Sequence, residues 1–141
     1  MGTRIVARLL GKLLVFYALF MFIPLIYALV RQEPVYMAFV LSCAVTAAFG
    51  IGLSCYGENP GRISIREGFL VVAGTWFLAS GCGALPYWLS GSVPTYLDAV
   101  FETVSGLTTT GASIIPDVES LPESLLLWRS LTHWLGGMGI I

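Results

Sequence analysis

Long runs of apolar residues, each about the length of a membrane-crossing helix, occupy most of the first half of the chain. Leu9 to Val30 is a run of 22 residues interrupted only by Lys12, and Val35 to Tyr56 is a charge-free run of 22. At ~1.5 Å per residue, each helix would be ~33 Å long, enough to cross the hydrocarbon core. The short polar turn between them, Arg31 to Pro34, predicts a membrane hairpin over residues 1–56.

A secretory signal peptide is the alternative interpretation of the first run. Arg4, Arg8 and Lys12 resemble the basic region that begins such a peptide. The apolar run is long for a signal peptide, however, and no cleavage motif of small residues follows it. We therefore expect a retained, spanning helix.

The connection after the hairpin, residues 57–68, is polar and contains the turn formers Asn59, Pro60 and Gly61. Phe69 to Leu89 then forms a third charge-free run, long enough for another spanning helix. The pattern predicts a chain that crosses the membrane at least three times.

Basic residues near the predicted helix ends are divided unequally between the two sides of the membrane. Only Arg31 and Arg129 fall on one side, and the other side holds Arg4, Arg8, Lys12, Arg62 and Arg66. Cytoplasmic loops of membrane proteins carry an excess of Lys and Arg. The pattern therefore places the amino terminus and the connection 57–68 in the cytoplasm.

A short helix is predicted after the third span. Pro94 followed by Thr95 is a helix-start signal, and Thr95 with Asp98 matches a capping box, in which each side chain satisfies a free backbone amide. Gly106 and the β-branched residues Thr108 to Thr110 disfavour helix. About 11 or 12 helical residues remain, or ~17 Å, which reaches only halfway through a bilayer.

The segment after this helix, Thr108 to Ala112, is predicted to return toward the outer side in an extended conformation. Irregular backbone at membrane depth is tolerated only within protein or against water, which indicates a re-entrant pore loop. An extended backbone offers one carbonyl per residue in place of a cation's hydration shell. Gly111 can adopt a positive φ and leaves room for the ion. The threonines offer both carbonyls and hydroxyls to a cation such as K⁺.

An ordinary outer loop rich in turn formers is the alternative interpretation of this segment. The surrounding sequence favours the pore loop. A capped helix of half-membrane length precedes it, the acidic segment 116–124 follows it, and a further apolar stretch begins at Leu125. This order is that of a helix, a pore loop and a second helix.

Composition supports a membrane protein and excludes several function classes. The chain is 57% hydrophobic and 11% charged, with a net charge of −1, so no basic surface for nucleic acid is expected. The three cysteines match neither a zinc site nor a disulfide framework, and His133 lacks further metal ligands at suitable spacing. We expect no enzyme activity and no cofactor, because no catalytic set is recognisable.

Two charged residues near the pore loop have several possible roles. Glu102 lies one helical turn after Asp98, where it could stabilise the pore helix through a partner or influence the field at the ion. Arg129 could interact with Asp98, with Glu102 or with a neighbouring unit, or it could extend to the headgroups. The glycine-rich segment Gly136 to Gly139 does not match a nucleotide-binding loop and indicates close helix packing.

Two stretches, Asp98 to Ser113 and His133 to Ile141, resemble the Trk, Ktr and HKT superfamily of potassium transporters. The amino-terminal hairpin resembles the TrkH/TrkG branch in particular. The resemblance implies four helix–pore–helix units around one axis, with Thr108 to Ala112 as the first filter segment. Within it, the resemblance implies K⁺ ligands at Thr109, Thr110 and Gly111. In plant relatives a serine at the position of Gly111 accompanies sodium transport, so Gly111 favours potassium. The resemblance also implies a bacterial inner-membrane location, a homodimer partner and a cytosolic nucleotide-binding regulatory subunit.

The expected fold is therefore an all-α membrane protein. It comprises the hairpin 1–56, the cytoplasmic loop 57–68, and a helix–pore loop–helix unit over residues 69–141 whose second helix is incomplete. Because only one Thr-Thr-Thr-Gly segment is present, we interpret the chain as an amino-terminal fragment that supplies one of four filter segments and does not conduct alone. The alternative from another class is a small membrane-packing or accessory protein without ion conduction.

Overall fold

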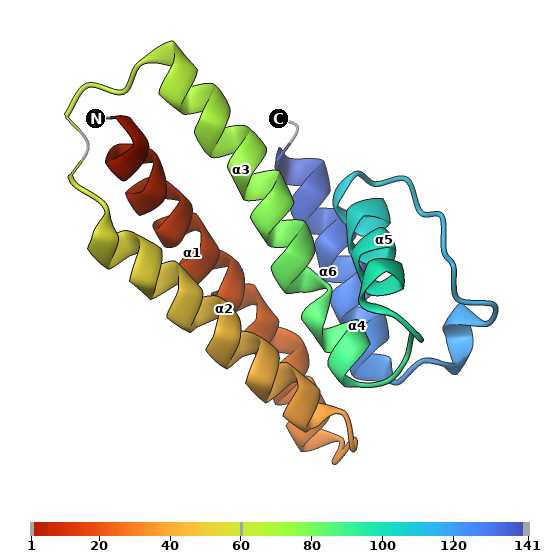
Figure 1. Ribbon diagram of the computed structural model, residues 1–141. Coiled ribbons are helices and arrows are strands. Elements are labelled where there is room, and N and C mark those ends of the chain that lie inside the picture. Colours follow the sequence, from red (N-terminus) through yellow and green to blue (C-terminus); the bar gives the residue numbers. More distant parts are fainter. Residues whose placement is uncertain (1, 60, 140–141) are drawn as a thin grey trace.

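The computed structural model describes residues 2–59 and 61–139 and is built from helices (Figure 1). In chain order these are α1 (Gly2–Val30), α2 (Tyr36–Tyr56), α3 (Ile65–Gly83), α4 (Leu85–Leu89), α5 (Tyr96–Leu107), the 3₁₀ turn η1 (Val118–Ser120) and α6 (Glu123–Gly139). The expected all-α architecture is confirmed: a helical hairpin is followed by two longer helical segments with a short helix between them. The predicted turn residue Pro60 and the predicted end of the last helix, Ile140 and Ile141, lie outside the described residues.

Three helical segments are long and apolar enough to cross a membrane: Gly2–Val30, Tyr36–Tyr56 and Ile65–Leu89, the last combining α3 and α4. These are the three spans that the hydropathy pattern predicts, and they make the chain a membrane protein. Two of them begin earlier than expected. Helix α1 starts seven residues before Leu9, and α3 starts four residues before Phe69, inside the predicted loop 57–68.

The early start of α3 has a local cause in the sequence. The Ser64 hydroxyl accepts a hydrogen bond from the Glu67 amide at 3.3 Å, and the Glu67 carboxylate accepts one from the Ser64 amide at 2.8 Å. This is a complete capping box, which satisfies two amides that a helix start otherwise leaves free. Hydropathy alone could not locate this boundary, because the first turn of α3 is polar.

Helices α1 and α2 cross closely because glycine stands at the contact on both sides. A Cβ placed on Gly11 would lie 2.5 Å from the Gly50 carbonyl oxygen, and one on Gly50 would lie 2.9 Å from the Gly11 carbonyl oxygen. At the amino-terminal end, Arg4 pairs with Glu58 at 2.7 Å and Arg8 donates to the Gly57 carbonyl at 3.2 Å. These contacts hold the predicted hairpin together.

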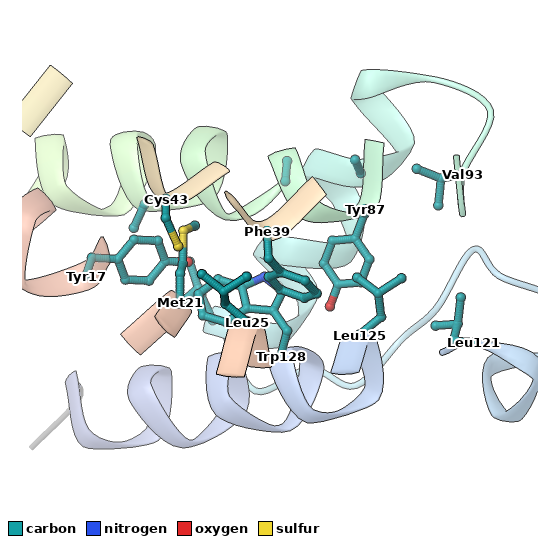
Figure 2. Packing of buried hydrophobic residues seen from close by; sticks show 14 residues of the cluster. Tyr17, Met21, Leu25, Phe39, Cys43, Tyr87, Val93, Leu121, Leu125 and Trp128 are labelled. Atoms are coloured by element: carbon teal, nitrogen blue, oxygen red, sulfur yellow. The ribbon is translucent and has the colours of Figure 1, made fainter. Parts of the chain in front are cut away.

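The hydrophobic core lies where the hairpin meets the remaining helices (Figure 2). Trp128 of α6 is fully buried there, in edge-to-face contact with Tyr17 of α1 at 5.5 Å between ring centroids. Its indole nitrogen donates to the carbonyl of Gly83 at 3.0 Å, at the break between α3 and α4. The core thus fixes α6 against both the hairpin and the third span, and α6 in turn supports α5.

The turn between α1 and α2 also contacts the start of α6. The Glu33 carboxylate accepts a hydrogen bond from the Ser124 amide at 3.2 Å, and Arg31 pairs with Glu123 at 3.3 Å. Glu33 therefore acts as a cap for α6 from a distant part of the chain, since the first amides of a helix have no partner within it. The amino-terminal hairpin positions α6 at its first turn as well as at the core.

Candidate ion-binding site

Thr95 caps the start of α5, the predicted pore helix, at the position that the sequence predicts. Its hydroxyl accepts a hydrogen bond from the Asp98 amide at 3.2 Å. The reciprocal half of the predicted capping box is not formed, because the Asp98 carboxylate accepts from the Thr95 hydroxyl at 2.7 Å and not from the Thr95 amide. Thr95 is thus a single side-chain cap, with Asp98 placed favourably near the positive end of the helix dipole.

Replacing Thr95 with alanine is expected to destabilise the chain by about 1 kcal/mol, because the Asp98 amide loses its partner. The measurement is the thermal midpoint of the purified chain in detergent, which should fall by a few degrees. Thr75→Ala is the matched control. The Thr75 hydroxyl only bonds back to the Val71 carbonyl within α3, so its loss should have little effect. Equal losses in the two variants would contradict the capping role.

Helix α5 has the half-membrane length that the sequence predicts. It contains 12 residues and is ~18 Å long. It starts near the end of the molecule where the α1–α2 turn lies, and the chain that follows it runs back to that end (Figure 1). Its last residue, Leu107, lies against Gly136 of α6, 13 residues or ~20 Å along α6 from Glu123. Thr108 to Ala112, named the filter segment after its predicted role, therefore begins ~20 Å along α6 from the first residue of that helix.

The pore helix ends in a Schellman motif. The Thr109 amide donates to the Gly106 carbonyl at 3.0 Å, and the Thr110 amide donates to the Ser105 carbonyl at 2.9 Å. Thr109 has a φ of 57° and occupies the left-handed position that glycine usually fills. A β-branched residue in this conformation is strained, by roughly 1–3 kcal/mol. The motif directs the amides of the filter segment back toward α5.

The carbonyl oxygens of the filter segment fall into two groups. Those of Thr108, Thr109 and Thr110 accept no hydrogen bond from any residue in the ranges 2–59 and 61–139. In contrast, the Gly111 carbonyl accepts one from Arg129 at 3.2 Å, and the Ala112 carbonyl accepts one from the Ser105 hydroxyl. Three consecutive carbonyls are therefore free to coordinate a ligand.

The filter segment is exposed on the surface of this chain from Thr108 through Ala112. The hydroxyls of Thr108 and Thr110 lie 2.8 Å apart, which places two of the three threonine side chains together. Gly111 has a φ of 78°, as predicted from its role in turning the backbone. The prediction of an extended segment is therefore wrong, because Thr109 and Gly111 are left-handed and Thr108 and Thr109 form a turn. The segment is a strained, oxygen-rich turn that is open on one side and held by α5 and α6 on the other.

Glu102 and Arg129 hold the chain that leaves the filter segment. Glu102 is 1% exposed, and its carboxylate accepts hydrogen bonds from the Ser113 hydroxyl at 2.7 Å and from the Ile114 amide at 2.5 Å. Arg129 lies 3.7 Å from the other carboxylate oxygen. Of the partners considered for Arg129 from the sequence, the structure shows Glu102. His133 packs beside them, its Nδ1 lying 2.8 Å from the Arg129 carbonyl oxygen.

The close helix packing that the sequence indicates for the glycines of α6 is confirmed at Gly136 and not at Gly137 or Gly139. A Cβ on Gly136 would overlap the carbonyl group of Leu107, whereas one on Gly137 would lie 3.9 Å from the nearest atom of Thr109. On the facing helix, a Cβ on Gly106 would overlap the Thr132 hydroxyl. Close approach of α5 and α6 therefore depends on Gly136 and Gly106, which bring the filter segment against α6.

Comparison with known proteins places this geometry in a family. The family model described as TrkH, a cation transport protein, matches residues 35–141. The whole chain is 40% identical to the Trk system potassium uptake protein TrkH of Halomonas elongata and 38% identical to that of Escherichia coli K12, and covers 30% of each. The chain thus spans about 30% of the length of these relatives.

A solved structure is similar over almost the whole chain. The crystal structure of the potassium transporter TrkH from Vibrio parahaemolyticus matches with a TM-score of 0.92 at 32% identity, over 99% of this chain and 30% of that one. The family model covers more than half of the chain, and the arrangement of the helices agrees with that of the solved relative. The chain belongs to the TrkH family of cation transport proteins.

Proposed function

We propose that the chain contributes one filter segment, Thr108 to Ala112, to a pore that transports potassium ions. The observation that carries the proposal is the row of three carbonyl oxygens, at Thr108, Thr109 and Thr110, without a hydrogen-bond donor among the described residues. Unpaired carbonyls at membrane depth are costly unless they meet water or a cation. A dehydrated K⁺ requires several such oxygens in place of its water shell.

The backbone conformation supports the same assignment. The Schellman motif engages the amides of Thr109 and Thr110, so the carbonyls that remain free are those suited to a cation. Gly111 keeps one lone pair on its carbonyl oxygen after bonding to Arg129 and remains a proposed ligand together with Thr109 and Thr110. The filter segment also follows the carboxyl end of α5, where the helix dipole is negative and favours a cation.

A single filter segment cannot surround an ion, so the proposed pore requires further units. The relatives named as potassium uptake proteins are more than three times as long as this chain, which leaves room for them. We propose a multi-pass location in the bacterial inner membrane with a cytoplasmic amino terminus. A homodimer partner and a cytosolic nucleotide-binding regulatory subunit remain predictions from the resemblance.

The proposal can be tested in a chimaera in which residues 1–141 replace the matching part of Escherichia coli TrkH. It is expressed in cells that lack their own potassium uptake systems, and uptake of Rb⁺, a tracer for K⁺, is measured. We expect the chimaera to restore Rb⁺ uptake and growth at low K⁺, and the chain alone to restore neither. A chimaera that accumulates in the membrane but takes up no more Rb⁺ than vector-bearing cells would contradict the proposal.

A further inference from the structure

A buried carboxylate in the middle of the pore helix is not explained by the filter segment itself. Glu102 has a fully buried side chain within a helix that enters the membrane, where an unpaired charge is expensive. Its two hydrogen bonds go to Ser113 and Ile114, the first residues after the filter segment. The carboxylate thus joins the descending helix to the returning chain across the base of the loop.

Arg129 completes a bridge from this carboxylate to the filter segment. Its Nε lies 3.7 Å from Oε2 of Glu102, which is an electrostatic contact beyond hydrogen-bond distance, and its Nη2 donates to the Gly111 carbonyl at 3.2 Å. Its side chain is 21% exposed, so water screens this charge only partly. The positively charged guanidinium of Arg129 is therefore hydrogen-bonded to a carbonyl that is proposed to face a cation.

We propose that Glu102 and Arg129 are positioning residues that set the apparent affinity of the filter segment for K⁺. Arg129 fixes the direction of the Gly111 carbonyl. Glu102 holds the returning chain and cancels the charge of Arg129 at the ion. This inference rests on the proposed function, since it assigns these residues an effect on the same ion.

The two charges make opposite electrostatic contributions, which a purely structural role would not. Without the Glu102 charge, the uncompensated guanidinium would repel a cation at the filter segment. Without Arg129, the uncompensated carboxylate would attract one, and the Gly111 carbonyl would lose its anchor. Removal of both charges would leave the electrostatic potential at the filter segment near its original value.

The test is a double-mutant cycle on Rb⁺ uptake by the chimaera. KM is measured together with the maximal rate, which is normalised to the amount of protein in the membrane. Glu102→Gln keeps the shape and an acceptor oxygen, and should raise KM on the order of tenfold. Arg129→Gln should lower KM and weaken discrimination against Na⁺. The double variant should return KM to within about threefold of the parent. If Glu102→Gln does not accumulate, Arg129→Gln and the double variant still give the sign of the effect.

The matched control is the exposed pair at the other end of the molecule. Arg4 and Glu58 lie 2.7 Å apart with side chains 55% and 62% exposed, so Arg4→Gln and Glu58→Gln should leave KM within about twofold. KM values that shift in the same direction in both Glu102→Gln and Arg129→Gln, or that do not shift, would overturn the inference while the chimaera still transports. A parent chimaera without Rb⁺ uptake would instead refute the proposed function, and the inference with it.

Discussion

Replacing Gly136 with alanine is expected to abolish Rb⁺ uptake by the chimaera. A Cβ at this position would overlap the carbonyl group and the Cα of Leu107. These are backbone atoms of the last residue of α5 and cannot move aside as a flexible side chain could. The clash would push α5 and α6 apart at the residue that precedes the filter segment. Overpacking of this kind costs about 1–3 kcal/mol or more, in addition to the loss of geometry at Thr108 to Thr110.

Gly137→Ala provides the matched control for this prediction. It introduces the same Cβ on the next residue of α6, where the nearest atom, Cγ2 of Thr109, is at an ordinary contact distance of 3.9 Å. Alanine is also favoured over glycine in a helix by about 1 kcal/mol. Thermal midpoints and Rb⁺ uptake of the two variants should therefore differ clearly. If Gly136→Ala and Gly137→Ala behave alike, the close contact of α6 with Leu107 is not what positions the loop.

Replacing Gly111 with serine is expected to reduce Rb⁺ uptake strongly and to increase the share of Na⁺ that enters. Gly111 has a φ of 78°, a conformation that costs a residue with a side chain roughly 1–2 kcal/mol. Space is not the limiting factor, since among the described residues the only atom within contact range of a Cβ there is Nε2 of His133, at 4.0 Å. The expected effect therefore comes from a changed backbone direction at the proposed ion ligands.

Gly91→Ser separates this effect from a general loss of stability. Gly91 has a φ of 73°, and a Cβ there would meet no atom of residues 2–59 or 61–139 within 4 Å. It lies in the turn after α4, outside the filter segment. The two serine variants should lose similar stability, whereas only Gly111→Ser should alter the ratio of Rb⁺ to Na⁺ uptake. An unchanged ratio in Gly111→Ser would show that this glycine does not shape the ion site.

Local signals in the sequence were sufficient for most of the fold. Hydropathy identified the three spans, and Pro94 with Thr95 placed the start of α5, because both signals act within a few residues. The same signals did not give the start of α3, where the boundary depends on the polar capping box of Ser64 and Glu67. They also suggested a reciprocal role for Asp98 that the structure does not show.

The site was less accessible to sequence reasoning, because its contacts join distant residues. The positive φ of Gly111 followed from residue type, but nothing in the sequence indicates that Thr109 is left-handed, since β-branched residues avoid that conformation. Glu102 could be recognised as deep on the pore helix. Its bonds to Ser113 and Ile114 depend on how the returning chain folds against α5. The contact of Gly136 with Leu107 likewise required the packed helices.

The most direct test of the account is to locate ions in crystals of the chimaera grown with Rb⁺ or Tl⁺, using anomalous diffraction. The central claim is that main-chain oxygens of the filter segment replace the water around a potassium ion. We expect an anomalous peak that marks an ion coordinated by carbonyl oxygens of Thr108 to Gly111 and by the equivalent segments of the other units. Ions bound elsewhere along the pore, with none at this segment, would contradict the claim.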